Sequence, residues 1–258
     1  MRIINRLGVP ETIFRLLETD FYDHDQAKGT LSATTLNKPA QMVVLTERHW
    51  DEIEIEAMDR LWVVLGMGVH AALQSSDTTS PGVVVPDRLR VDFAGAAISG
   101  LPDFLDVLRI DNNSVVDYKV TKAFSLVYMS HLQDWIKQLS IYRWLWWKVK
   151  DAVLSEIGRI VAILRDWDER EVAKKPKYPN QPMLELMIPL WSPAKTEAYI
   201  LDRVKAIEEA RTKTDAELPK CTDEERWWNW TQKKYLRCEK YCQVRAFCRQ
   251  HNSGGVAE

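Results

Sequence analysis

The stretch that decides the fold of this chain is Gly100-Leu101-Pro102-Asp103, followed after thirteen intervening residues by Asp117-Tyr118-Lys119. Side chains two residues apart on a strand point to the same face, so Asp117 and Lys119 share a face and Tyr118 points away. We expect residues 98–110 and 114–120 to pair as strands across a turn at 111–113, which places Asp103 in the same sheet region. Two carboxylates and one ammonium group then converge.

Such a group of side chains suits the hydrolysis of a phosphodiester bond. Carboxylate oxygens hold Mg²⁺ or Mn²⁺, and the cation lowers the pKa of a bound water and neutralises charge on the phosphate. Lys119 can orient or deprotonate the attacking water, or stabilise the charge of the transition state. The sequence leaves these roles of Lys119 open. Asp106 and Asp111 are rival carboxylates that lack the Gly-x-x-Asp pattern.

Helical and strand patterns alternate around this stretch. Helices are expected over residues 11–22, 51–74, 131–148 and 193–211. Strands are expected over residues 89–93, 98–110, 114–120, 157–164 and 184–188. This order predicts a mixed α/β core with one central β-sheet over residues 1–218, which includes an N-terminal helical region. A small Cys/Trp-rich tail over residues 219–258 is expected to pack on that core as a metal module.

The composition limits the kinds of partner. The chain has 258 residues, 46% of them hydrophobic, which is enough for a substantial core. Its 35 Lys and Arg residues face 37 Asp and Glu residues, so any surface for nucleic acid must be local. The N-terminus does not have the pattern of a secretory signal, and the apolar stretch at 61–73 is shorter than the roughly 20 residues of a membrane span. We therefore expect a cytoplasmic protein, bacterial or phage-encoded, with no membrane partner.

Two further pairs of residues have a spacing that suits a site. His70 closes Gly66-Met67-Gly68-Val69-His70 near the end of a predicted helix, where an imidazole would add a softer ligand that favours Mn²⁺. The alternative is a packed core histidine or a helix cap. Gln138 and Tyr142 lie four residues apart and share one face of the predicted 131–148 helix. Their alternative role is a polar rim on a buried helix.

Taken together, Gly66-x-x-x-His70, Gly100-x-x-Asp103, Val116-Asp117-Tyr118-Lys119 and Gln138-x-x-x-Tyr142 resemble the RecB-like branch of the PD-(D/E)XK nuclease superfamily. The resemblance implies a restriction-endonuclease-like core with a central mixed sheet flanked by helices. It implies a metal ion held by His70, Asp103, Asp117 and the backbone carbonyl of Tyr118. It also makes Lys119 catalytic and places Gln138 and Tyr142 beside the scissile phosphate.

All four cysteines lie in the C-terminal tail, at Cys221, Cys238, Cys242 and Cys248. Four thiolates so close together suit a Zn²⁺ site or an iron–sulfur cluster, and two disulfides are the remaining alternative. The resemblance favours a 4Fe-4S cluster over zinc, because the AddB nuclease domain and the CRISPR-associated RecB-like exonucleases carry one. Those relatives take one cysteine from far upstream, whereas here Cys221 would have to supply the fourth ligand.

The tail is also basic and aromatic. Residues 231–251 contain six Lys and Arg residues against Glu239 alone, a local charge of +5. Cations interleaved with aromatic residues suit phosphate contacts and base stacking on a single strand. The alternative is that the tryptophans pack around the metal and the cations form a solvated face. The residues predicted to bind nucleic acid are Lys233, Lys234, Arg237 and Lys240.

We therefore expect a divalent-metal-dependent deoxyribonuclease. The favoured activity is that of an exonuclease on single-stranded DNA or DNA ends, in repair, recombination or phage DNA metabolism, with a protein partner in a DNA-processing complex as a further expectation. One alternative is a restriction-type endonuclease on the same core, although no helix-turn-helix or zinc-finger pattern supplies target recognition. The other is a catalytically silent nucleic-acid-binding module with a structural metal, which the intact Asp103, Asp117 and Lys119 set argues against.

Overall fold

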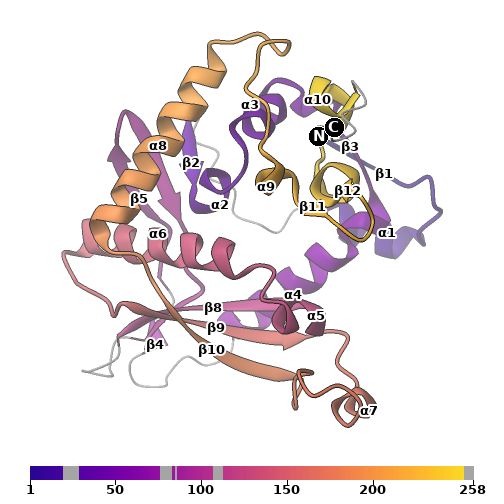
Figure 1. Cartoon of the computed structure of the whole chain (residues 1–258), viewed down its shortest axis with the longest axis vertical. Coiled ribbons are helices and arrows are strands. Elements are labelled where there is room, and N and C mark those ends of the chain that lie inside the picture. Colours follow the sequence, from indigo (N-terminus) through magenta and orange to yellow (C-terminus); the bar gives the residue numbers. More distant parts are fainter. Residues whose placement is uncertain (20–28, 76–82, 85, 107–112, 253–258) are drawn as a thin grey trace. The chain divides into compact units, whose positions relative to one another are not determined.

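The computed structural model of the chain describes residues 1–19, 29–75, 83–84, 86–106 and 113–252 (Figure 1). The chain divides into two compact units. The first, here called the sheet unit, comprises Tyr22–Asn37 and Val63–Ile200. The second, the cysteine unit, comprises Met1–Phe21, Lys38–Trp62 and Leu201–Glu258. Helices α4 (Leu61–Ser75) and α8 (Pro193–Arg211) have residues in both.

The sheet unit contains a five-stranded mixed sheet. In order across the sheet, its strands are β10 (Met183–Pro189), β9 (Ile157–Leu164), β8 (Ser114–Thr121), β7 (Phe104–Asp106) and β4 (Val83–Val84). Strands β8 and β9 are parallel, and the other neighbouring strands are antiparallel. Because parallel neighbours need a crossover, the chain between β8 and β9 passes through α5 (Ala123–Val127) and α6 (Leu132–Lys150).

A three-stranded sheet completes the core of the sheet unit. Its order is β2 (Thr30–Ser32), β6 (Ala96–Gly100) and β5 (Leu89–Phe93), with β5 and β6 forming a hairpin. Ala94 and Gly95 both have positive φ in its two-residue turn, the combination that a type I′ hairpin requires. Helix α6 contacts strands of both sheets (Figure 1), which explains why its side chains are buried on most sides. The short helices α2 (Ala33–Leu36) and α7 (Glu169–Val172) complete the unit.

The cysteine unit is built from short elements. A parallel pair, β1 (Arg2–Ile4) and β3 (Glu54–Glu56), accompanies α1 (Glu11–Glu18) and α3 (Ala40–Arg48). Two 3-10 helices, η1 (Trp50–Glu52) and η2 (Ala57–Arg60), flank β3. The tail adds α9 (Asp223–Arg226), the hairpin of β11 (Trp228–Asn229) and β12 (Lys234–Tyr235), the π-helix η3 (Arg237–Tyr241), η4 (Arg245–Phe247) and α10 (Arg249–Asn252). Within the described residues, no helix combines the length and the apolar character that crossing a bilayer requires.

The mixed α/β class is confirmed, and so are α6, α8, β9 and β10 near their predicted positions. The predicted helix over 51–74 is wrong in its first part, because Glu54–Glu56 is a strand. Its partner, Arg2–Ile4, lies about fifty positions earlier, and Arg2 and Arg6 form ion pairs with Glu54. Local periodicity cannot show such a distant partner.

Two expectations about the strands are also corrected. The predicted strand over 98–110 is divided, because Pro102 has no N–H group to donate to a ladder. Its first part, Ala96–Gly100, pairs with β5 in the three-stranded sheet, and Phe104–Asp106 pairs with β8 as predicted, while residues 107–110 lie outside the described part of the chain. The single central sheet is therefore two sheets. The predicted helix end at 20–22 and the turn positions 111–112 lie outside the described residues.

Candidate active site and cysteine cavity

The predicted catalytic residues converge in the sheet unit. Asp117 and Lys119 lie on β8, where the strand repeat places them on one face. Asp103 immediately precedes β7, whose first residue, Phe104, pairs with Val116. In an antiparallel pair the next position back on one strand faces the next position forward on the other, so Asp103 lies beside Asp117.

Asp103 is held by two donors. Its Oδ1 lies 2.9 Å from Nδ1 of His70 on α4, and its Oδ2 accepts a 2.8 Å hydrogen bond from the backbone N–H of Tyr118. The carboxylate raises the pKa of His70 above its usual value, mainly through this hydrogen bond and despite the opposing effect of burial. The predicted ligands His70 and Asp103 are thus in direct contact. At Tyr118 the group that contacts Asp103 is the backbone N–H, whereas the predicted ligand is the carbonyl.

Asp117 is the most deeply buried carboxylate of the site, with 3% of its surface exposed. Burial raises its pKa to about 6, although the Lys119 ammonium group, 2.5 Å from Oδ2, acts in the opposite direction. Among the described residues, Oδ2 of Asp117 has the Lys119 ammonium group as its ion-pair partner and no further hydrogen-bond donor.

A relay of hydrogen bonds links Lys119 to α6. The Lys119 ammonium group donates to Oε1 of Gln138 at 3.2 Å, and Nε2 of Gln138 donates to the Tyr142 hydroxyl at 2.8 Å. Gly100 lies against the ring of Tyr142, where an added Cβ would come within 2.8 Å of ring carbons and of Leu145. The glycine of the Gly100-x-x-Asp103 motif thus makes room for the tyrosine of the fourth motif.

The donor set of this site suits a hard divalent cation. It has two carboxylates and an imidazole, and one buried carboxylate oxygen lacks a hydrogen bond. In the part of the chain that the structure describes, no three His, Cys, Asp or Glu residues are grouped so that they could hold a metal ion. The reason is visible in the contacts, since Asp103 is paired with His70 and Asp117 with Lys119. Binding a cation would require Asp117 to exchange the ammonium group for the metal.

A model of the PD-(D/E)XK nuclease superfamily matches residues 17–249 of this chain. The chain belongs to this superfamily. Membership makes it a nuclease that acts on nucleic acid, in a superfamily whose members typically use Mg²⁺ or Mn²⁺. The crystal structure of SSO0001 is similar with a TM-score of 0.55 and 16% sequence identity, covering 93% of this chain and 95% of that chain. That likeness concerns the fold alone, and no curated protein matches the chain.

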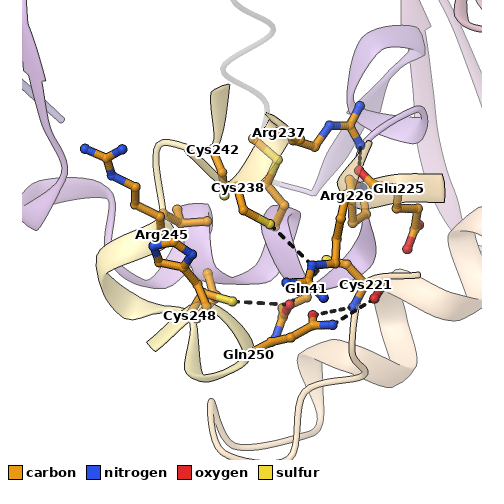
Figure 2. A pocket seen from close by; sticks show the side chains of 15 residues that line it. Gln41, Cys221, Glu225, Arg226, Arg237, Cys238, Cys242, Arg245, Cys248 and Gln250 are labelled. Carbon is orange, nitrogen blue, oxygen red and sulfur yellow. Dashed lines mark hydrogen bonds between the residues drawn. The ribbon is translucent and has the colours of Figure 1, made fainter. Parts of the chain in front are cut away.

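The four tail cysteines line one cavity within the cysteine unit (Figure 2). All four are free thiols, so the alternative of two disulfides is not what the structure shows. Burial raises the pKa of Cys221 to about 12 and also raises that of Cys242. Four thiols that line one cavity are a donor set for soft metal ions, whose binding would favour the thiolate form.

Two polar side chains contact these sulfur atoms. The thiols of Cys221 and Cys248 donate to Oε1 of Gln41, on α3, with sulfur–oxygen distances of 3.3 Å and 3.6 Å (Figure 2). Nε of Arg226 donates to the Cys238 sulfur at 3.5 Å. The sequence interpretation missed Gln41, although one signal was present: it is the only polar residue in the apolar run from Ala40 to Leu45.

The residues predicted to bind nucleic acid differ in their surroundings. Lys233 and Lys240 are exposed, and Lys234 is half-buried on β12. Arg237 stacks over the Trp227 ring at 4.1 Å and donates to the Glu225 carbonyl at 2.8 Å. Its guanidinium group therefore takes part in packing within the module itself.

Proposed function

We propose that this chain hydrolyses phosphodiester bonds in DNA, with a divalent cation held by His70, Asp103, Asp117 and the backbone carbonyl of Tyr118. The observation that supports this proposal most strongly is the buried carboxylate of Asp117, which lies beside Asp103 and is paired with the Lys119 ammonium group. Burying a carboxylate is costly unless a positive charge offsets it. A divalent cation could take the place of the ammonium group and offset the charges of both carboxylates.

The surrounding residues would position and charge the site. A divalent cation would supply charge neutralisation at the phosphate and acidify a water molecule. Asp103 is oriented by His70 and by the Tyr118 N–H group, so its oxygens are fixed before substrate binds. Lys119, released from Asp117, would remain attached to Gln138 and would direct its protons at the attacking water or at the developing charge on the phosphate. Tyr142 would orient Gln138, because its hydroxyl accepts a hydrogen bond from the Gln138 amide.

We further propose that the enzyme is an exonuclease on single-stranded DNA or DNA ends, in repair, recombination or phage DNA metabolism, and not a restriction-type endonuclease. No recognition helix of the kind used by sequence-specific DNA-binding modules is evident in the sequence. A catalytically silent module is less favoured, because an inactive protein has no need to keep a buried carboxylate next to a half-buried lysine. A protein partner in a DNA-processing complex remains part of this proposal.

A second proposal concerns the cysteine cavity, which we propose holds a 4Fe-4S cluster of the RecB-like kind, with zinc as the alternative. Four thiols line its wall, a ligand set that suits either group, and the resemblance to RecB-like nucleases is what favours the cluster. Gln41 would connect the cysteine tail to α3, because it contacts two of the four sulfur atoms. The exposed Lys233 and Lys240, with Lys234 and Arg237, are proposed to contact the strand.

The decisive experiment is a cleavage assay of the whole chain on 5′- and 3′-labelled single-stranded and duplex DNA, and on RNA, with Mg²⁺ and Mn²⁺. Asp117→Asn and Lys119→Gln are each expected to lower the cleavage rate by about a hundredfold or more, because both groups act at the reacting phosphate. Laddering from one labelled end would identify the exonuclease mode and its polarity.

Matched controls are available on α8. Asp202→Asn and Lys205→Gln change the same chemical groups at exposed positions and should leave the rate unchanged. Cleavage that survives Asp117→Asn in a preparation free of other nucleases would show that the assignment of the site is wrong. Activity on RNA but not on DNA would overturn only the choice of substrate.

A further inference from the structure

Two large aromatic side chains are exposed at α5, directly after the strand that carries the proposed catalytic residues: Phe124 lies in the helix and Tyr128 caps its end. Phe124 and Tyr128 expose 61% and 67% of their surface, and their ring centroids lie 4.4 Å apart. They are four residues apart, so they lie on the same side of this short helix. Aromatic rings are normally buried against other side chains, so a neighbouring pair in water marks a surface that binds something.

The position of this pair is set by the sheet unit. The Ala123 N–H donates to Oδ1 of Asp166 at 2.7 Å, and the Arg165 N–H donates to the Thr121 carbonyl at 3.0 Å. These bonds attach the start of α5 to the chain that follows β9, and Figure 1 shows α5 at this end of the two strands. Phe124 is five residues beyond Lys119, which limits their Cα separation to about 18 Å.

Cations accompany the aromatic pair. Lys122 is exposed and stands between the catalytic strand and Phe124. Lys175 is exposed and forms a 2.6 Å ion pair with Glu171, which raises its pKa, and Tyr178 and then Tyr128 raise that pKa by smaller amounts. Glu171 also binds Lys174, so the acidic charge here is shared between two lysines. Rings flanked by ammonium groups suit a ligand that is both flat and anionic.

We infer that Phe124 and Tyr128 form a stacking platform for unpaired bases of the DNA strand next to the scissile phosphate, with Lys122 and Lys175 near its phosphates. This inference rests on the proposed nuclease function and names the substrate class as single-stranded. Bases within a duplex are stacked on one another and cannot lie on a protein ring unless they are unpaired. The platform therefore supplies a physical reason for a preference for single strands.

The test measures binding without cleavage, using the whole chain with Asp117→Asn and a fluorescein-labelled oligothymidylate. The double substitution Phe124→Ala with Tyr128→Ala is expected to weaken binding by about ten- to a hundredfold, the usual loss when one or two stacked bases lose their platform. The conservative pair Phe124→Tyr with Tyr128→Phe should bind almost as tightly as the parent. Binding of a duplex of the same length should change little in either variant.

An oligonucleotide with abasic sites separates stacking from other effects. It should bind the parent weakly, and the double alanine substitution should then cause no further loss. The control variant is Trp50→Ala, which removes another exposed ring, 45% exposed and followed by Asp51 and Glu52, and which should leave binding unchanged. The inference is overturned if the double alanine variant binds single strands like the parent, or loses duplex binding to the same degree. If the chain with Asp117 intact cleaves DNA in that case, the proposed function stands and only the platform is wrong.

Discussion

At the scale of single residues, the candidate site is a set of groups that satisfy one another. Asp103 is bound to His70, and Asp117 to Lys119, which bridges to Gln138. Burial keeps the pKa of Asp117 above its usual range, so this carboxylate gains more from a cation than an exposed one would. The same contacts that hold the residues in place must open when a metal ion binds.

Gly100 is the residue whose role is purely steric. Gly100→Ala places a Cβ 2.8 Å from the Tyr142 ring, so we expect a loss of about 1–3 kcal/mol in the free energy of unfolding, as in other overpacked cores. The cleavage rate should also fall, because the displaced Tyr142 no longer orients Gln138. Urea unfolding and the cleavage assay measure the two effects.

Gly66→Ala provides the matched control. A Cβ at Gly66 meets no atom within 4 Å, and the residue lies inside α4, where alanine is favoured over glycine by about 0.5–1 kcal/mol. We expect equal or higher stability and an unchanged cleavage rate. If Gly100→Ala were as harmless as Gly66→Ala, the close packing of Gly100 against Tyr142 would not be a constraint.

At the scale of elements, the end of α3 is held by His49. His49 caps this helix, with Nδ1 2.8 Å from Glu52 and Nε2 2.7 Å from Asp215, and its ring stacks on Phe247 at 4.1 Å. The hydrogen bond with Asp215, followed by that with Glu52, raises the pKa of His49 above its usual value of 6.5. The ring therefore connects α3 to the residues after α8 and to the tail.

The raised pKa of His49 predicts the pH dependence of stability. Because the folded-state pKa lies above the unfolded one, the contribution of His49 is complete below about pH 6.5 and is lost as pH rises through the folded-state pKa. His49→Gln should lower the free energy of unfolding by about 1–3 kcal/mol at pH 6 and by much less at pH 9. Urea unfolding of both proteins at several pH values measures this, and parallel stability curves would contradict the charged role.

At the scale of the whole molecule, the chain combines two chemically different donor sets. The sheet unit has the oxygen-rich group of Asp103 and Asp117, which suits hard divalent cations, and the cysteine unit has a cavity lined by four thiols. A small module of short elements, such as the tail, buries little apolar surface by itself. A metal or cluster bound by these thiols would therefore contribute directly to the folding of the tail.

The cluster proposal predicts a visible property of the intact protein. Protein purified without oxygen should be brown and contain iron and sulfide in near-equal amounts. Cys242→Ser should lower the iron content and the Tm, because the thiolate ligand is lost. Gln243→Ser, at the neighbouring position, should keep both. A colourless protein with one zinc ion per chain would instead support the zinc alternative and would leave the proposed nuclease site unaffected.

The order of residues along the chain was enough to predict the mixed α/β class and the group of Asp103, Asp117 and Lys119. Both follow from local rules, since the two-residue strand repeat places Asp117 and Lys119 on one face and the 3.6-residue helical repeat places Gln138 and Tyr142 on another. The motifs shared with the superfamily add what these repeats cannot show, namely that the separate segments belong to one site. The match over residues 17–249 confirms the superfamily to which they point.

Only the tertiary structure decided which distant segments meet. The pairing of Glu54–Glu56 with Arg2–Ile4 and the separation of β6 from β7 were not predicted, because a strand is stabilised by partners that its own sequence does not identify. The contact of Gln41 with two cysteine sulfur atoms was missed for the same reason. Local periodicity reports the face on which a side chain lies, whereas burial and close packing between elements determine what that face contacts.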